Sequence, residues 1–322
     1  MTATNSAVPF FAGVFGIRSA SQTARAAAVY TAPISTNCTS SSSGACYFAF
    51  ARDSNCADTG ITLSNNGNVT IKGGIWSNSG LNMSGTDNNG NWGSVTYGKG
   101  CTYTPSNAPK GPSFTSGPSP HPPLPAWPRD YTTVITACGG VGNACNSSQT
   151  PNFCTKSAQN FGTSTSSTYA LTSGQVYCAY GNGNPNDPST WNGTIYAAPA
   201  TGSYRDTFIG GYVNIAPQGS VTLSSQLSTS VGSLLVYAND TNLQSPTGTS
   251  AADISTQGSA SLSGDIFVPN GTLNFSTQGT GLATTFLEAY RLTINAGGGI
   301  NGDGPSTGTD GTTLAGSDQL TQ

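Results

Sequence analysis

Residues 260–275 read Ala-Ser-Leu-Ser-Gly-Asp-Ile-Phe-Val-Pro-Asn-Gly-Thr-Leu-Asn-Phe. Apolar and polar residues alternate in Ala260–Leu262 and again in Thr272–Phe275, which is the period-two pattern of strands with one buried face. Gly264 and the pair Asn270-Gly271 interrupt these runs with residues typical of turns. The stretch therefore predicts short strands joined by tight turns.

A glycine followed by an aliphatic and then an aromatic residue recurs along the chain. It occurs in Gly74–Trp76, Gly193–Tyr196 and Gly264–Phe267, and alternating strands at Leu81–Met83 and Leu273–Phe275 soon follow the first and the third. Stacked coils of a solenoid require short strands that recur with similar shape. An antiparallel β-sandwich is the main alternative, because it also uses short strands at regular spacing. The low charge and the lack of a clear hairpin pattern favour the solenoid.

The predicted fold is mainly β, a right-handed parallel β-helix (solenoid) with an N-terminal α-helix and disulfide-rich loops. Its strands are expected to come from both sides of a proline-rich connector. Its inward side chains are expected to include Ile61, Leu63, Ile75, Ile195, Val221, Leu223, Leu235, Leu262, Ile266, Leu273 and Ile294.

The N-terminal part of the chain divides into two predicted segments. Residues 1–30 are a helical segment, because Phe11, Val14 and Phe15 recur at helical spacing after Pro9. Residues 31–104 are β-rich, disulfide-containing coils.

The remainder divides into three. Residues 105–130 are a connector, rich enough in proline to exclude a strand ladder and to favour an extended polyproline conformation. Residues 131–300 contain cysteine-bearing loops followed by parallel β-helix. Residues 301–322 are rich in Gly, Ser and Thr and are expected to be a flexible tail.

Composition excludes several classes of function. Ten Lys and Arg among 322 residues, with a formal net charge of -3, form no basic patch of the kind that nucleic-acid phosphates require. No run of 18 apolar residues occurs, so no membrane-spanning helix is predicted within the chain. The apolar run Val8–Ile17 is followed rather than preceded by arginine, which is the wrong polarity for a signal peptide. A targeting segment is expected upstream of Met1.

The cysteines indicate an oxidising compartment. An even number of cysteines without Cys-x-x-Cys spacing, in a chain with a single histidine, favours disulfides over zinc, and no metal site or cofactor is expected. Eight cysteines allow 105 pairings, so none is assigned. The disulfide candidates are Cys38, Cys46, Cys56, Cys101, Cys138, Cys145, Cys154 and Cys178.

The sequence offers few groups for catalysis. His121 lies between two prolines of the connector, where little can pack around a general base. The acids of the C-terminal half, which could form a glycosidase-like pair, are Asp253, Asp265, Glu288 and Asp303, and none lie two residues apart. No catalytic residue is assigned, and the chain is predicted not to be an enzyme.

Two segments together resemble the TadE/TadG-like proteins of bacterial tight-adherence (Flp) pilus assembly. The first is Val8–Ile17 running into Ala20–Ala28, and the second is the C-terminal set Leu234–Tyr237, Gly264–Asn270, Leu273–Phe275 and Leu292–Ile294. The resemblance implies an envelope location and a role in pilus assembly or surface adhesion, and it implies no catalytic residues. The N-terminal membrane helix of that family is missing from this sequence.

The predicted function is a non-catalytic extracytoplasmic structural or adhesive envelope protein, cell-surface located and anchored to the membrane in the full-length protein. Pilus-assembly or other envelope proteins, and surface glycans, are its expected partners. The competing hypothesis is a β-helical protein that binds or cleaves polysaccharide through carboxylates.

Overall fold

The computed structural model describes residues 2–7, 20–25, 27–29, 47–65, 69–71, 74–85, 91–92, 95–98, 100–106, 114–116, 154–155, 159–162, 171–184, 190–217, 219–229, 232–239, 250–256, 258–278, 286–297, 300–302 and 319–321. Regular structure in these residues consists almost entirely of β-strands. The chain forms two compact units, residues 1–34 with 313–322, and residues 35–312.

The first unit consists of antiparallel strand pairs. β1 (Thr2–Ala7) pairs with β2 (Ala20–Arg25), and β3 (Ala27–Val29) pairs with β28 (Gln319–Thr321). In place of the helical segment predicted for residues 1–30, the described residues form strands β1, β2 and β3, because cross-strand pairing satisfies their backbone groups. Residues 8–19 lie outside the described residues. The flexible tail predicted for 301–322 is likewise wrong at β28.

In the second unit, one long row of parallel strands, ladder 1, runs from one end of a stack to the other. In spatial order it contains β13 (Cys154–Thr155), β15 (Val176–Ala179), β18 (Thr207–Gly210), β22 (Gly232–Ala238), the first part of β25 (Asp265–Thr277), the first part of β26 (Leu287–Ala296), β4 (Tyr47–Ala51), β7 (Gly74–Ser77), β10 (Val95–Tyr97) and β12 (Phe114–Ser116). β21 (Leu227–Thr229) adds an antiparallel partner to β22.

A second parallel row, ladder 2, runs alongside the first. It contains β14 (Gln159–Gly162), β16 (Thr194–Ala198), β19 (Tyr212–Ile215), β23 (Ser250–Thr256), the second parts of β25 and β26, β5 (Thr59–Asn65), β8 (Gly80–Gly85) and β11 (Tyr103–Ser106).

Two shorter parallel rows together make ladder 3. One joins β17 (Gly202–Arg205), β20 (Val221–Ser224) and β24 (Ala260–Ser263), and the other joins β27 (Ile300–Gly302), β6 (Val69–Ile71) and β9 (Asn91–Trp92). Successive strands pass from ladder 1 to ladder 2 to ladder 3 in β4–β5–β6, β7–β8–β9, β15–β16–β17, β18–β19–β20 and β22–β23–β24, and β26 leads to β27 in the same order. Apart from the β21–β22 pair, the described strands of the three ladders pair in parallel, which rules out the antiparallel sandwich that was the alternative.

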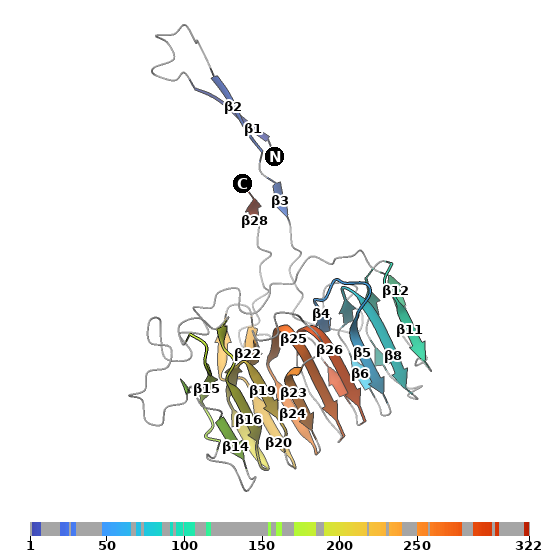
Figure 1. The fold of residues 1–322 in the computed structure, drawn as a ribbon, viewed down its shortest axis with the longest axis vertical. Coiled ribbons are helices and arrows are strands. Elements are labelled where there is room, and N and C mark those ends of the chain that lie inside the picture. The colour runs from blue at the N-terminus through green and yellow to red at the C-terminus, as the bar shows by residue number, and fades with distance from the viewer. Residues whose placement is uncertain are drawn as a thin grey trace. The chain divides into compact units, whose positions relative to one another are not determined.

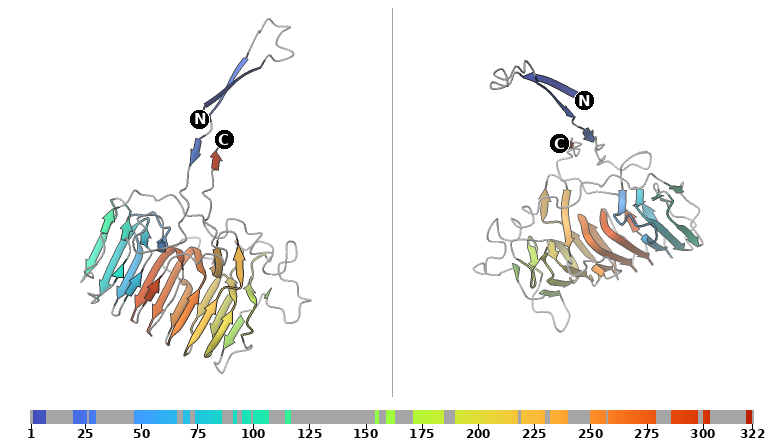
Figure 2. Two further views of the ribbon diagram at one scale, coloured as in Figure 1. Left: turned by 180° about the vertical axis from the view of Figure 1, so that it is seen from behind. Right: turned by 45° about the horizontal axis from the view of Figure 1, so that its top comes forward.

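The order of the strands in space differs from their order in sequence. The chain enters the stack in its middle at β4, proceeds outward to β12, resumes at the opposite end at β13, and returns to finish at β26 and β27. Figure 1 shows the blue strands β4 and β5 beside the orange-red strand β26, and Figure 2 shows the same order from behind. We call the boundary between β26–β27 and β4–β6 the seam, because no covalent turn crosses it.

In the sequence, the proline-rich segment therefore connects β12, at one end of the stack, with β13, at the other end. At about 4.8 Å per strand, the distance from β12 to β13 along ladder 1 is roughly 45 Å. An extended segment of residues 117–153, at about 3.1 Å per residue, spans roughly 110 Å and is therefore long enough to connect them. The expectation that no ladder enters the proline-rich stretch is wrong at β12. Its three residues lie between Pro112 and Pro118, and a terminal strand pairs along only one edge.

The space between the ladders is filled by inward-pointing apolar side chains. All eleven inward residues predicted from the sequence are buried members of one core cluster: Ile61, Leu63, Ile75, Ile195, Val221, Leu223, Leu235, Leu262, Ile266, Leu273 and Ile294. They belong to columns of register partners such as Leu273, Leu292, Ile61 and Leu81. Identical positions on successive strands thus stack on one another along the core.

The outward faces of ladders 1 and 2 differ. On ladder 1 the outward column is buried as well, and it includes Cys178, Ile209, Tyr237 and Phe267 in a second apolar cluster. On ladder 2 the strands alternate between buried inward and partly or fully exposed outward residues, as in Thr194–Ala198 and Tyr212–Ile215. The accessible flat surface therefore lies on ladder 2.

Candidate functional site

The outward residues of ladder 2 form a surface that we call the polar face. One column of register partners runs Tyr196, Asn214, Asp253, Asn274, Thr293, Thr62, Asn82, Thr104. A second column, two residues further along each strand, runs Ser255, Ser276, Asn295, Ser64, Ser84.

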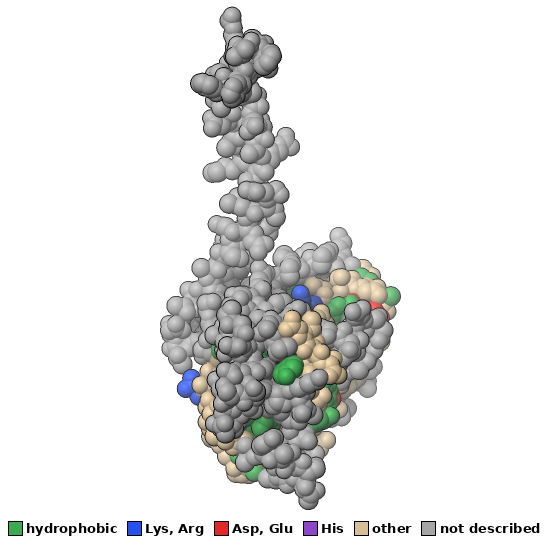
Figure 3. Space-filling model, turned by 60° about the vertical axis from the view of Figure 1, so that its left-hand side comes forward, with side chains coloured by type: hydrophobic (Ala, Val, Ile, Leu, Met, Phe, Trp, Pro, Cys, Tyr) green, Lys and Arg blue, Asp and Glu red, His purple; other side chains and the backbone are tan. Residues whose placement is uncertain are grey.

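Short polar side chains at these positions follow from the alternation in the sequence, in segments such as Thr62-Leu63-Ser64 and Thr293-Ile294-Asn295. Neighbouring strands lie about 4.8 Å apart, so each column places a hydrogen-bonding group at that interval. The hydroxyls of Ser64 and Ser84, for example, are 3.2 Å apart. Asp253 is the one charged residue in the two columns, and the side drawn in Figure 3 also shows few charged groups on the described surface.

One end of the polar face contains an aromatic and acidic group, the tyrosine–aspartate cluster of Tyr196, Tyr212, Asn214, Asp253 and Asn274. The Tyr212 hydroxyl donates to Asp253 Oδ2, and Asn274 Nδ2 donates to Asp253 Oδ1 at 2.8 Å. Asn214 Nδ2 donates to the Tyr212 hydroxyl at 3.3 Å. The Tyr196 ring meets the Tyr212 ring edge-on at 6.0 Å. These contacts hold the side chains of four successive strands in fixed positions.

Tyr196 and Tyr212 have different surroundings within this cluster. Tyr196 is 45% exposed and is the one large apolar side chain that is exposed among the described residues. Burial, followed by the hydrogen bond with Asp253, raises the pKa of Tyr212 to about 12. Tyr212 therefore remains a protonated donor at any physiological pH.

The carboxylates considered for catalysis are distributed over different parts of the structure. Asp265 and Glu288 lie on ladder 1 and are 2% and 1% exposed, whereas Asp253 belongs to the polar face of ladder 2. Glu288 is paired across the seam with Arg52, whose Nε lies 3.6 Å from Oε1. Asp303 and His121 lie outside the described residues. The structure therefore brings no two of the described candidate acids together on an accessible surface.

A second charged group, the seam cluster, joins β26 to the loop after β4. Arg291 Nε lies 2.7 Å from Asp53 Oδ2, and its Nη2 lies 2.6 Å from Asp58 Oδ2. Asp53 is fully buried, and its Oδ1 accepts from the Tyr290 hydroxyl at 3.1 Å and from the backbone N–H of Asn55 at 2.9 Å. The partners are far apart in sequence, so this cluster fastens the two chain segments that meet at the seam.

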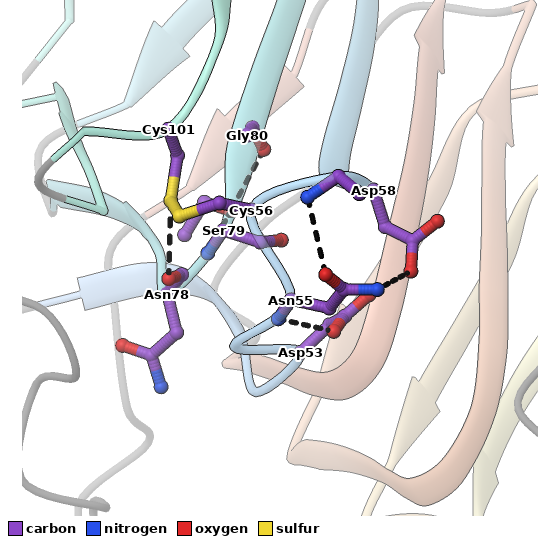
Figure 4. Close-up of a disulfide and its surroundings, with 10 residues drawn as sticks. Asp53, Asn55, Cys56, Asp58, Asn78, Ser79, Gly80 and Cys101 are labelled. Carbon is purple, nitrogen blue, oxygen red and sulfur yellow. Dashed lines mark hydrogen bonds between the residues drawn. A yellow bond between two sulfur atoms is a disulfide. The ribbon is translucent and has the colours of Figure 1, made fainter.

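The loop between β4 and β5 also carries a disulfide. Cys56 is bonded to Cys101, which precedes β11, with a Cα–Cα distance of 4.6 Å. Figure 4 shows the disulfide beside the turn of Asn78 and Ser79. The carbonyl oxygen of Asn78 lies 4.0 Å from Cys101 Sγ. A Cβ on Gly80 would lie 2.8 Å from the Asp58 carbonyl oxygen, so the three stacked turns leave no room for a side chain there.

The remaining disulfide candidates are described only in part. Cys178 is disulfide-bonded, and its backbone is in register with that of Cys154 on the neighbouring strand. Cys38, Cys46, Cys138 and Cys145 lie outside the described residues.

Neither the seam cluster nor the tyrosine–aspartate cluster was recognised from the sequence. The alternation predicted a strand at Thr272–Phe275, but the register that aligns Asn274 with Asp253 and Asn214 comes from stacking. The salt bridges of Arg291 connect residues more than two hundred positions apart, and no local pattern signals such a pair.

Among the described residues, no group of three or more His, Cys, Asp or Glu is placed to hold a metal ion. None of the described segments forms a helix with the length and apolar character that a membrane crossing requires. In comparisons with protein-family models, curated proteins and solved structures, none matched this chain.

Proposed function

We propose that this protein is a non-catalytic structural or adhesive component of a bacterial cell surface, built on a right-handed parallel β-helix with the three ladders as its faces. Two features support the β-helix. Successive strands visit ladders 1, 2 and 3 in turn, and parallel strands joined by crossovers are almost always connected with right-handed sense.

The observation that carries the adhesive role is the polar face. It is a flat, accessible array of short hydrogen-bonding side chains with a single carboxylate. Such a surface can contact a partner through hydrogen bonds over many strands, and of the described candidate acids only Asp253 lies on it.

The extracytoplasmic location is supported by the Cys56–Cys101 bond and by the oxidised state of Cys178, because disulfides persist in oxidising compartments. The link with pilus assembly rests on the resemblance of Val8–Ile17 and the C-terminal strands to the TadE/TadG-like proteins. In that setting the protein is anchored to the membrane, and pilus-assembly proteins are its partners.

Polysaccharide cleavage is the competing function, and it would depend on Asp265 and Glu288. Their burial supports a structural role, since a polymer substrate cannot reach side chains that are 2% and 1% exposed without rearrangement of the surface.

The test combines three measurements on the full chain and on Asp265→Asn and Glu288→Gln. We expect co-purification with pilus-assembly proteins from the native host, loss of surface attachment in a deletion strain, and no release of reducing ends from polysaccharides. Cleavage that disappears in either variant while the thermal midpoint is unchanged would replace this proposal with the enzyme.

A further inference from the structure

The tyrosine–aspartate cluster differs from the rest of the polar face. It combines the exposed ring of Tyr196 with a network of amide, hydroxyl and carboxylate groups on β16, β19, β23 and β25. Beyond it, the same column continues with Thr293, Thr62, Asn82 and Thr104. An aromatic platform is therefore continuous with a row of uncharged hydrogen-bonding groups.

We propose that this cluster and the column beyond it bind a neutral polysaccharide, with the chain laid along the stack across successive strands. The Tyr196 ring packs against the apolar face of one sugar ring, and Asn214, Asp253 and Asn274 hydrogen-bond to the hydroxyls of the following sugars. This inference rests on the proposed adhesive function and names its ligand class.

The spacing of the column suits such a ligand. Successive strands present one polar group about every 4.8 Å, close to the length of one pyranose unit in an extended chain. Asp253 is already oriented by Tyr212 and Asn274, so little conformational freedom is lost when it accepts a ligand hydroxyl.

The charge and composition of the face argue against other polymers. Nucleic acids require Lys or Arg to neutralise their phosphates, and the one charge in the column is a carboxylate. A protein partner usually buries a core of large apolar side chains, whereas Tyr196 is the one such side chain exposed among the described residues. An uncharged polymer rich in hydroxyl groups complements both features.

The experiment measures binding of the full chain to cellohexaose and chitohexaose by calorimetry, and to insoluble cellulose and chitin by pull-down. Alginate serves as an anionic comparison. We expect binding to at least one neutral probe, no binding to alginate, and an affinity about tenfold weaker for Tyr196→Ala. Tyr196→Trp retains an aromatic platform and should bind within about threefold of the parent.

Asn214→Ala tests the polar column, and we expect weaker binding than in the parent. Thr222→Ala is the matched control, because Thr222 is an exposed strand residue of β20 in ladder 3, away from the polar face. It should bind as the parent does. The thermal midpoints of all variants are measured as well, and unchanged midpoints exclude loss of folding as the cause of weaker binding.

Absence of binding to every neutral probe would overturn the inference, as would equal affinities for the parent and Tyr196→Ala. Retention on a growing ice surface without polysaccharide binding would replace it with recognition of ordered water. If surface attachment or co-purification persists without glycan binding, the proposed function remains supported and only the assignment of a polysaccharide ligand is refuted.

Discussion

Asp206 lies at the corner between β17 and β18, where the chain leaves ladder 3 for ladder 1. Its Oδ1 accepts the backbone N–H of Gln175 at 3.0 Å, and its Oδ2 has no hydrogen-bond partner. Burial raises the pKa of this carboxyl from 3.8 to about 6, while the bonds from Gln175 and Gly174 partly offset the rise.

This shift has a defined effect on stability. Between about pH 4 and pH 6 the folded state keeps a proton that the unfolded chain has released, so the contribution is fully present below the unfolded pKa and is lost as the pH rises through the folded pKa. At about 1.4 kcal/mol per pKa unit the loss amounts to roughly 3 kcal/mol.

We expect Asp206→Asn to flatten the pH dependence of stability, because the amide oxygen can still accept the backbone bonds without carrying a charge. Thermal midpoints of the parent and the variant from pH 4 to pH 7 measure this. The difference between the two proteins isolates Asp206, since the other carboxylates titrate in both. Parallel profiles would show that the pKa of Asp206 is the same in the folded and the unfolded protein.

At the scale of elements, the seam is the boundary where stacking has no covalent turn to support it. The pairs Arg291–Asp53, Arg291–Asp58 and Arg52–Glu288 all cross it. In a chain with only 7% charged residues, this concentration indicates that ion pairs supply the specificity of the junction.

Arg291→Ala should therefore destabilise the protein by about 3–5 kcal/mol, because it leaves the fully buried Asp53 without its cation. Arg205→Ala is the control, since Arg205 is exposed and its Nε makes one long bond, 3.5 Å, to the Ser225 carbonyl. Its loss should cost less than about 1 kcal/mol. Urea unfolding midpoints compare the two, and equal losses would contradict a special role for the seam.

The sequence predicted best those strands that have only one face buried in the core. The short alternating strands around Ile61, Ile195 and Leu273 were found because period-two patterning survives whatever the strand pairs with. The helix expected from Phe11, Val14 and Phe15 was predicted to continue through residues that form β2 and β3. An alanine-rich run can form a helix or a strand, and long-range pairing decides which of the two it forms.

At the scale of the whole molecule, the chain enters and leaves its stack at the same place. Elsewhere the passage from ladder 3 to the next strand of ladder 1 is very short, with Asp206 alone between β17 and β18 and Gly264 alone between β24 and β25. A link of a few residues from Gly302 to Tyr47 should therefore replace the seam by an ordinary turn.

A permuted chain of residues 154–302, a short glycine–serine link, and residues 47–116 should fold into the same stack without the proline-rich connector. We expect a single cooperative thermal transition and the β-rich circular dichroism of the parent. Two separate transitions, or a permutant that unfolds while the parent stays folded, would show that the segments outside the stack are required to assemble it.

The sequence by itself determined the class of structure and the inward side chains. Alternation, glycine-bounded turns and low charge are local properties, and they predict short strands with aliphatic residues on one side. The even number of cysteines predicted disulfides, and Cys56 is bonded to Cys101.

Only the tertiary structure decided which strands are neighbours. Pairing of β26 with β4 and β5 places the seam cluster, and register across β16, β19, β23 and β25 assembles the tyrosine–aspartate cluster. A parallel strand presents the same backbone groups to any partner, so local sequence cannot specify which strand it joins. That choice depends on side chains that meet only after the chain has folded.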